Sequence, residues 1–157
     1  MFQYGGDVIA RSISSIFGVS EVAASNNNLT APATNNADFV VKVVKDTLSA
    51  NDAKFVLTSD SGIISDLETS VFKDVYDNSR WNIALKIVKD LDNKFVSSSA
   101  ATYKVELTGH NHVLDNLQNS FSVTSSLTLA EYQNFRSAHK TVFVGAQRTN
   151  ITGSVVT

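Results

Sequence analysis

Apolar and polar residues alternate along several short stretches of the chain, and this period of two constrains the fold more than any other feature. In Tyr103–Thr108 the sequence reads YKVELT, with an apolar residue at every odd position. Trp81–Lys89, WNIALKIVK, repeats the alternation. Because successive side chains of a strand point to opposite faces, both segments predict half-buried strands. We expect the first of them to end at Gly109, where a glycine interrupts the pattern.

Shorter apolar stretches predict the remaining strands. In Phe39–Val44 both parities are apolar, which is typical of a strand covered on both faces. The other candidates are an early segment at Ile13–Phe17, forming a first strand or an edge strand, and strands at Phe55–Leu57, Phe121–Val123 and Val142–Val144. Several short strands separated by polar turns favour an all-β antiparallel sandwich over alternating βαβ units.

Two segments carry the capping-box spacing, in which a Ser or Thr is followed three residues later by Glu. Ser65–Glu68 predicts a short helix over 66–76, because apolar residues follow at four-residue spacing. Thr128–Glu131 predicts one or two helical turns before Lys140. The sequence therefore predicts a β-sandwich with one or two short helices.

Length and composition limit the architecture and the partners. At 157 residues, with 43% apolar residues, the chain has the size of a single domain with one core, which we place over 1–157. A net charge of -2 without a run of like charges argues against nucleic acid as a partner. No apolar run approaches the roughly 20 residues of a spanning helix, so we expect no membrane insertion. The absence of cysteine excludes disulfides and thiolate metal sites.

The segment Ala23–Ala37, AASNNNLTAPATNNA, is rich in amide and small residues and lacks apolar periodicity. We interpret it as a long exposed loop, since it cannot bury enough surface to offset the entropy of ordering. Two functional interpretations compete with this one. The segment could form an Asn-rich binding loop, or Asn28 could be a glycosylation site in the tripeptide Asn-Leu-Thr.

The densest polar cluster lies in the segment TGHNHVLD at 108–115. Residues two apart on a strand share a face, so His110 and His112 could share a metal ion with Asp115 as a third ligand. The competing interpretation is exposed histidines at a turn, which the missing second ligand group favours. Carboxylates such as Glu106 are scattered, and no G-x-S-x-G elbow is present. We therefore predict no enzymatic activity and no cofactor.

Three segments together resemble the laminin-G-like, concanavalin A-like jelly-roll domains found in structural proteins of tailed marine phages. They are TSVFKDVYDNSRWNIALKIVKD, ATYKVELTGHNHVLDNLQNSFSVT and KTVFVGAQRTNITGSV. In that pattern a Trp-Asn step, here Trp81-Asn82, opens a core strand. A strand ending in Gly and polar residues follows, here Tyr103–Asn111. A V-x-V-G-A-x-R-T-N-x-T-G-S segment, here Val142–Ser154, precedes the closing strand.

The resemblance implies two stacked antiparallel sheets in a virion protein. It implies a non-enzymatic structural or adhesion module of a tail, fibre or capsid-associated part, which assembles with other virion subunits as an oligomer. The alternative is a carbohydrate-binding, lectin-like domain that contacts a host-surface glycan through Asn-rich loops and an exposed aromatic residue, Tyr76 or Tyr132. The glycosidase motif E-x-D-x-x-E of some relatives is absent. Their Glu-x-Asp metal pattern is also replaced, by Glu106 followed by Thr108.

In the family pattern the Thr-Gly-Ser-Val segment leads into a final strand that pairs near the N-terminal strand. Here the sequence stops at Thr157, two residues after that segment. An unpaired apolar sheet edge is unfavourable. We therefore expect that the chain is a piece of a longer polypeptide, or that another chain completes the sheet edge by strand addition.

Overall fold

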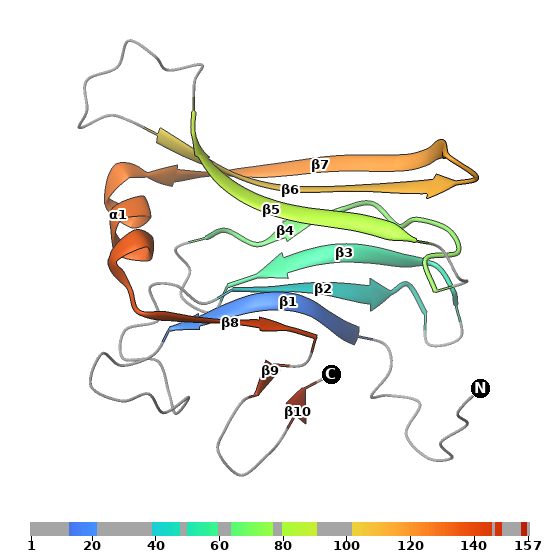
Figure 1. Ribbon diagram of the computed structural model, residues 1–157, viewed down its shortest axis with the longest axis horizontal. Helices are drawn as coiled ribbons and strands as arrows, with labels where there is room; N and C mark the ends of the chain where they lie inside the picture. The colour runs from blue at the N-terminus through green and yellow to red at the C-terminus, as the bar shows by residue number, and fades with distance from the viewer. Residues whose placement is uncertain are drawn as a thin grey trace.

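The computed structural model describes residues 13–21, 39–47, 50–59, 64–76, 80–90, 102–145, 147–148 and 155–156. Two antiparallel sheets face each other, and a single described helix lies at one end of them (Figure 1). The elements are β1 (Ile13–Glu21), β2 (Phe39–Lys45), β3 (Ala53–Thr58), β4 (Leu67–Glu68), β5 (Trp81–Lys89), β6 (Thr102–Val113), β7 (Asn116–Thr128), α1 (Leu129–Ser137), β8 (Lys140–Val144), β9 (Gln147–Arg148) and β10 (Val155–Val156).

The larger sheet has five strands in the order β4-β3-β2-β1-β8, and the smaller sheet has three in the order β5-β6-β7. Every strand pair is antiparallel. This arrangement confirms the predicted all-β sandwich. It also places β1 between β2 and β8, so that the N-terminal strand lies inside its sheet and the edge position that we considered for it is wrong.

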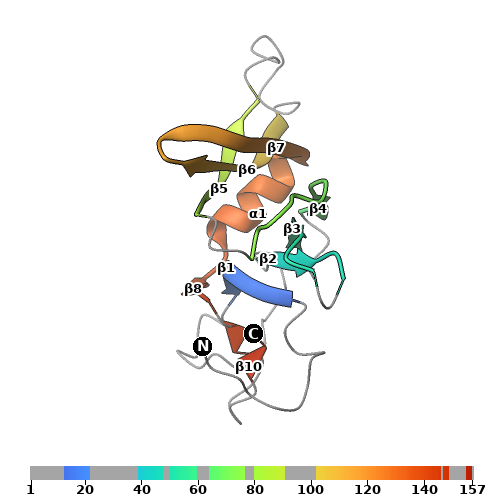
Figure 2. The same ribbon diagram turned by 90° about the vertical axis from the view of Figure 1, so that its right-hand side faces the viewer.

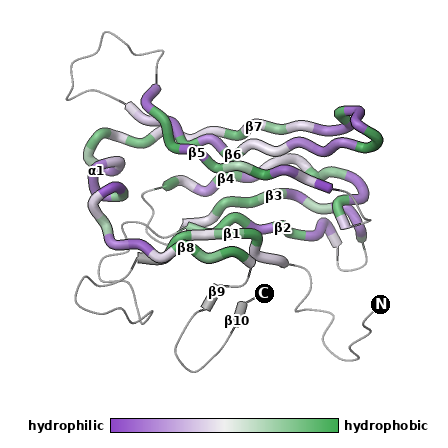
Figure 3. The backbone as a smooth tube through the Cα atoms, viewed as in Figure 1, coloured by the Kyte–Doolittle hydropathy of each residue, from purple (hydrophilic) through white to green (hydrophobic). Residues whose placement is uncertain are grey.

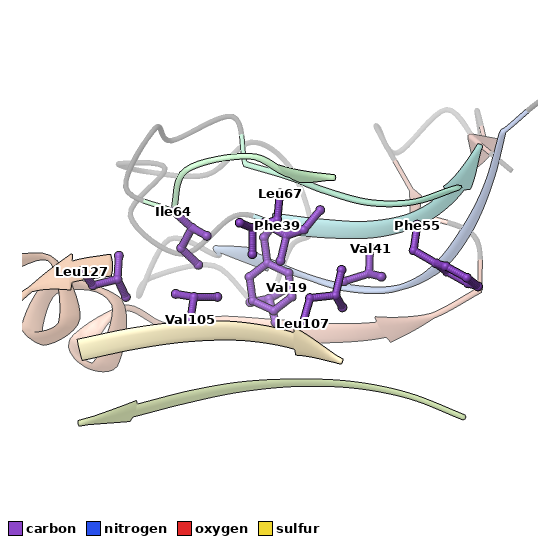
Figure 4. Close-up of a cluster of buried hydrophobic side chains, with 10 residues drawn as sticks. Val19, Phe39, Val41, Phe55, Ile64, Leu67, Val105, Leu107 and Leu127 are labelled. Carbon is purple, nitrogen blue, oxygen red and sulfur yellow. The ribbon is translucent and has the colours of Figure 1, made fainter. Parts of the chain in front are cut away.

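The period of two in the sequence becomes the division between core and surface. Val41 of β2 and Leu57 of β3 are fully buried from one sheet, and Val105 and Leu107 of β6 are fully buried from the other. These side chains meet between the layers with Phe55 (Figure 4). In β6 (Lys104, Glu106, Thr108) and along β7 polar residues occupy the alternate positions, which gives these strands their banded colouring in Figure 3.

Gly109 lies within β6, and the prediction that the strand ends there is wrong. The strand continues to Val113. A Cβ atom on Gly109 would lie 2.4 Å from the ring of Phe121 and 2.7 Å from Ile83 Cδ1. The glycine is therefore required by close approach of side chains from both neighbouring strands, and it does not mark a turn.

The turn itself is formed by Leu114 and Asp115, with φ of 48° and 63°. A two-residue hairpin loop with positive φ at both positions matches the right-handed twist of the strands it joins. Asn-Gly and Asp-Gly are the usual residues in such a loop. Leu-Asp does not carry that signature, which is why the sequence pattern placed the turn too early.

Trp81 packs against the core, as its place in the alternation predicts. Its ring centroid lies 4.9 Å from that of Phe55, 5.1 Å from that of Phe72 and 6.0 Å from that of Phe121. The rings of Phe55, Phe72, Trp81 and Phe121 pack against one another between the sheets, and the Phe121 ring also lies against Gly109. The Nε1 donor of Trp81 is buried and has no hydrogen-bond partner in the part of the chain that the structure describes.

Helix α1 begins at the predicted capping box. Thr128 Oγ1 accepts a hydrogen bond from Glu131 N, and the Glu131 carboxylate accepts one from Thr128 N at 2.7 Å. Phe135 of this helix stacks on Phe39 with ring centroids 6.1 Å apart. The helix therefore closes one end of the sandwich between β7 and β8 (Figure 1).

The predicted helix over 66–76 is wrong. Leu67 and Glu68 form β4, which pairs with β3, and Thr69 Oγ1 accepts a hydrogen bond from Phe55 N. Glu68 does not complete a capping box, because its carboxylate binds Lys54 at 2.6 Å. Backbone pairing with a neighbouring strand therefore prevails over the local capping signal at this site.

Two further predictions concern the loop and the chain end. The segment Ala23–Ala37, with Asn28, lies outside the described residues. Near the C-terminus, Val155–Val156 pairs with Gln147–Arg148 as a separate two-stranded sheet. The N-terminal strand β1 pairs with β2 and β8.

No helix in the described part of the chain is both long enough and apolar enough to span a membrane.

Candidate functional site

The edge strand β8 carries two exposed valines on the face that should be buried. Val142 is paired with Val19 of β1, and Val144 is paired with Phe17. Directly paired residues lie on the same face of a sheet. Val19 is 8% exposed and belongs to the core, whereas Val142 is 69% and Val144 is 85% exposed. The core-facing side of β8 is therefore uncovered.

The cause is the unequal width of the two sheets. β4 contacts β7, so β7 lies over the β4 end of the larger sheet and β5 lies toward its β1 end (Figure 2). Three strands do not cover five, and β8 extends beyond β5. The core-facing residues Ile83, Leu85 and Ile87 of β5 are correspondingly half-buried, while their neighbours on β6 are fully buried. We call the five residues Ile83, Leu85, Ile87, Val142 and Val144 the open flank.

The backbone N–H and C=O groups of the same two valines point away from β1. Gly145 N donates to Ile16 O of β1 at 2.7 Å, in the register that continues the β1–β8 pairing. In an antiparallel ladder the residues that bond to one neighbour alternate along the strand. Odd-numbered residues of β8 thus bond to β1, and the N–H and C=O groups of Val142 and Val144 point away from it. In the described part of the chain, β8 is the last strand of the larger sheet on this side.

Lysines commonly protect edge strands from pairing with other chains. β8 begins with Lys140, but its ammonium group donates to the carbonyl oxygens of Ala138, Phe135 and Arg136 at the end of α1. The lysine thus caps the helix, where a positive charge also favours the C-terminal end of the helix dipole. Residues 141–145, TVFVG, contain no charge.

The predicted metal ligands lie at the far end of the β6–β7 hairpin. His110 and His112 share a face, and their rings are 5.2 Å apart in an edge-on arrangement. Asp115 lies in the turn and is exposed like both histidines. Among the described residues, no three His, Asp or Glu side chains come together as a metal-binding group. The structure therefore brings the two histidines together without the third ligand.

The tip of the same hairpin also exposes three apolar side chains. Leu114 is 90% exposed, and Leu117 and Val113 are about half exposed. The residues lie around the tight turn, beyond the region that the larger sheet covers (Figure 1). This tip is a second apolar surface, and its residues come from both strands and from the turn between them.

The outer face of the smaller sheet holds an ion pair. Lys86 Nζ lies 2.9 Å from Glu106 Oε2, and Ser122 Oγ donates to Glu106 Oε1 at 2.8 Å. The hydrogen bond from Lys86, followed by that from Ser122, lowers the pKa of Glu106 below its ordinary value of 4.5. A lowered pKa keeps the carboxylate ionised, which suits a cross-strand ion pair and not a general acid.

Both aromatic residues suggested as sugar platforms have a ring face occupied. Tyr132 of α1 stacks on Tyr103 of β6 with ring centroids 3.8 Å apart. Lys45 Nζ lies 4.7 Å from the ring centroid of Tyr76, whose hydroxyl contacts Ser14 Oγ at 3.1 Å. One face of each ring is thus engaged within the domain.

Comparison of the chain with protein families, with curated proteins and with solved structures finds no match in any of the three.

Proposed function

We propose that the chain is a non-enzymatic structural module of a virion, which works by assembling with other protein subunits. The observation that supports assembly most directly is the exposure of Val142 and Val144 on the core-facing side of β8. Soluble monomers rarely leave an apolar edge strand uncovered, because such an edge pairs with other chains. A subunit that binds its neighbour through the open flank buries these two valines in the interface.

The virion setting of the proposal rests on the three segments that resemble phage structural domains, 69–90, 101–124 and 140–155. Two of them contribute to the open flank, through β5 and β8 respectively. The part of the chain that carries the resemblance is therefore also the part that presents the candidate surface. The proposal assigns the chain a structural role, in which it binds a neighbouring subunit and catalyses no reaction.

Mass spectrometry of purified particles tests this function. Particles produced from the genome that encodes the chain should contain it in several copies, in a fixed ratio to the major structural protein. A chain that is found in infected cells but is absent from particles would contradict the proposal. Hydrolysis of particle or host polysaccharides by the purified chain would contradict its non-enzymatic part.

A double variant connects the function to the site. Val142→Lys with Val144→Lys adds charge to the two exposed valines and removes no buried side chain. Incorporation into particles should fall at least tenfold for this variant. The matched control is Val88→Lys on β5, which changes an exposed valine on the outer face of that strand, outside the open flank. The control should be incorporated like the unmodified chain.

A further inference from the structure

We propose that β8 pairs antiparallel with β8 of a second copy of this chain, so that the two larger sheets join edge to edge. The inference rests on the proposed function and specifies the partner for the open flank. The proposed assembly is a homodimer in which Phe143 of one copy lies opposite Phe143 of the other, across the twofold axis. The strand edge, the side-chain pattern and the charge distribution of β8 each support this pairing.

The backbone groups of β8 suit such a pair. With Phe143 opposite Phe143 of the second copy, Val142 lies opposite Val144 of the second copy, and the reverse holds by symmetry. Val142 and Val144 are the residues whose N–H and C=O groups point away from β1, as the bond from Gly145 to Ile16 indicates. Directly opposed residues of this kind exchange two hydrogen bonds, so the two pairs would form four.

The side chains of β8 are self-complementary in the same register. In this register the valines at 142 and 144 lie opposite each other in both symmetry-related pairs, because a twofold axis places each residue of a surface opposite its counterpart on the second copy. On the core-facing side the exposed valines of the two copies would pack as cross-strand pairs. On the other side Phe143 already covers Gly18, where an added Cβ atom would lie 2.3 Å from its ring.

Two considerations favour a strand partner over a flat surface. The two valines are far too small to supply the roughly 800 Å² per partner that a stable protein interface buries. Main-chain hydrogen bonds from a paired strand provide the missing affinity. The partner strand must also tolerate an uncharged apolar neighbour. β8 itself meets this condition, because its one charged residue, Lys140, is engaged by the end of α1.

Sedimentation equilibrium of the full chain tests the pairing. The unmodified chain, of 17.0 kDa, should sediment with about twice that mass at micromolar concentration. The Val142→Lys, Val144→Lys variant should be monomeric, because each lysine would lie opposite a lysine of the second copy. The Val88→Lys control should remain dimeric. All three should give the same circular dichroism spectrum, which separates loss of pairing from loss of the fold.

Charge reversal gives a more specific test. A Val142→Glu, Val144→Glu variant should also be monomeric alone, and mixing it with the lysine variant should restore a dimer containing one copy of each. In the predicted register, opposite charges then face each other across the axis. A monomeric wild-type chain, or a lysine variant that stays dimeric, would overturn the inference. If the chain is nevertheless present in particles at a fixed ratio, the proposed function stands and only the homodimer fails.

Discussion

Phe17 and Val144 are direct partners in the β1–β8 ladder, yet Phe17 packs against the core whereas Val144 is 85% exposed. One strand spacing, about 4.8 Å, separates the covered part of the larger sheet from its uncovered part. This step in burial is where the smaller sheet ends. It defines the surface on which the proposed assembly depends.

Substitution of Gly109 by alanine should destabilise the domain by about 1–3 kcal/mol, because the added methyl group has no room beside Phe121 and Ile83. Urea denaturation followed by tryptophan fluorescence measures the effect through Trp81, the single tryptophan of the chain. Thr124→Ala, an exposed change on the neighbouring strand β7, is the control and should lie within about 0.5 kcal/mol of the unmodified chain. An equally stable Gly109→Ala protein would contradict the packing described for the aromatic cluster.

Trp81 offers a test of the buried, unpartnered donor. Trp81→Phe removes Nε1 and keeps an aromatic ring, so the loss of packing should be partly offset by removal of the unsatisfied N–H group. Trp81→Ala should cost about 3–5 kcal/mol, as other large-to-small core changes do. Thermal unfolding followed by circular dichroism should place the phenylalanine variant much closer to the unmodified chain. Equal destabilisation by both changes would indicate that the indole N–H group is bonded.

The capping box at α1 predicts a graded response at one position. Thr128→Ala should destabilise the domain by about 1 kcal/mol, because the side chain no longer accepts the hydrogen bond from Glu131 N. Thr128→Ser keeps the hydroxyl and should lose little. Chemical denaturation of both variants gives the comparison. Equal stabilities of the alanine and serine variants would show that the cap contributes nothing.

The ion pair on the outer face predicts a pH dependence. The pKa of Glu106 is lower in the folded chain than in the unfolded chain, so its stabilisation is present above the ordinary value of 4.5 and disappears as the pH falls through the folded pKa. Lys86→Met removes the largest cause of the shift. The variant should be less stable than the unmodified chain at pH 7, by no more than about 1 kcal/mol because Lys86 is largely exposed.

The difference between these two proteins should shrink below pH 4.5, and titration of the Glu106 carboxyl by nuclear magnetic resonance should show a higher pKa in the variant. A stability difference that stays constant from pH 7 to pH 3 would mean that Lys86 acts through packing instead of charge.

The strands with strict alternation could be predicted from sequence, and the reason is physical. In β5 and β6 each side chain meets either the opposite sheet or water, so the burial of neighbours differs in a regular way. The capping box at Thr128 was equally informative, because both hydrogen bonds of the motif are local in sequence. The same spacing at Ser65 does not produce a helix, because Leu67 and Glu68 pair with Leu57 and Val56 of β3.

The candidate site illustrates a different limit. Val142–Val144 is recognisable as a strand, but its alternation does not reveal that the apolar face is uncovered. That property depends on how many strands the opposite sheet contains and on where β5 lies relative to β8, which are relationships between distant segments. The expectation that His110 and His112 share a face came from strand geometry alone, and the structure places their ring centroids 5.2 Å apart. The third ligand, Asp115, depended on the position of the turn.

Amide hydrogen exchange of three successive residues of β8 tests the central claim most directly. The amide of Phe143 should be protected at every protein concentration, because odd-numbered residues of β8 bond to β1. The amides of Val142 and Val144 should be protected at high concentration and should exchange at least tenfold faster on dilution, or in the Val142→Lys, Val144→Lys variant. Fast exchange of Val142 and Val144 at all concentrations, with Phe143 protected throughout, would show that no strand pairs with this edge and would contradict the account.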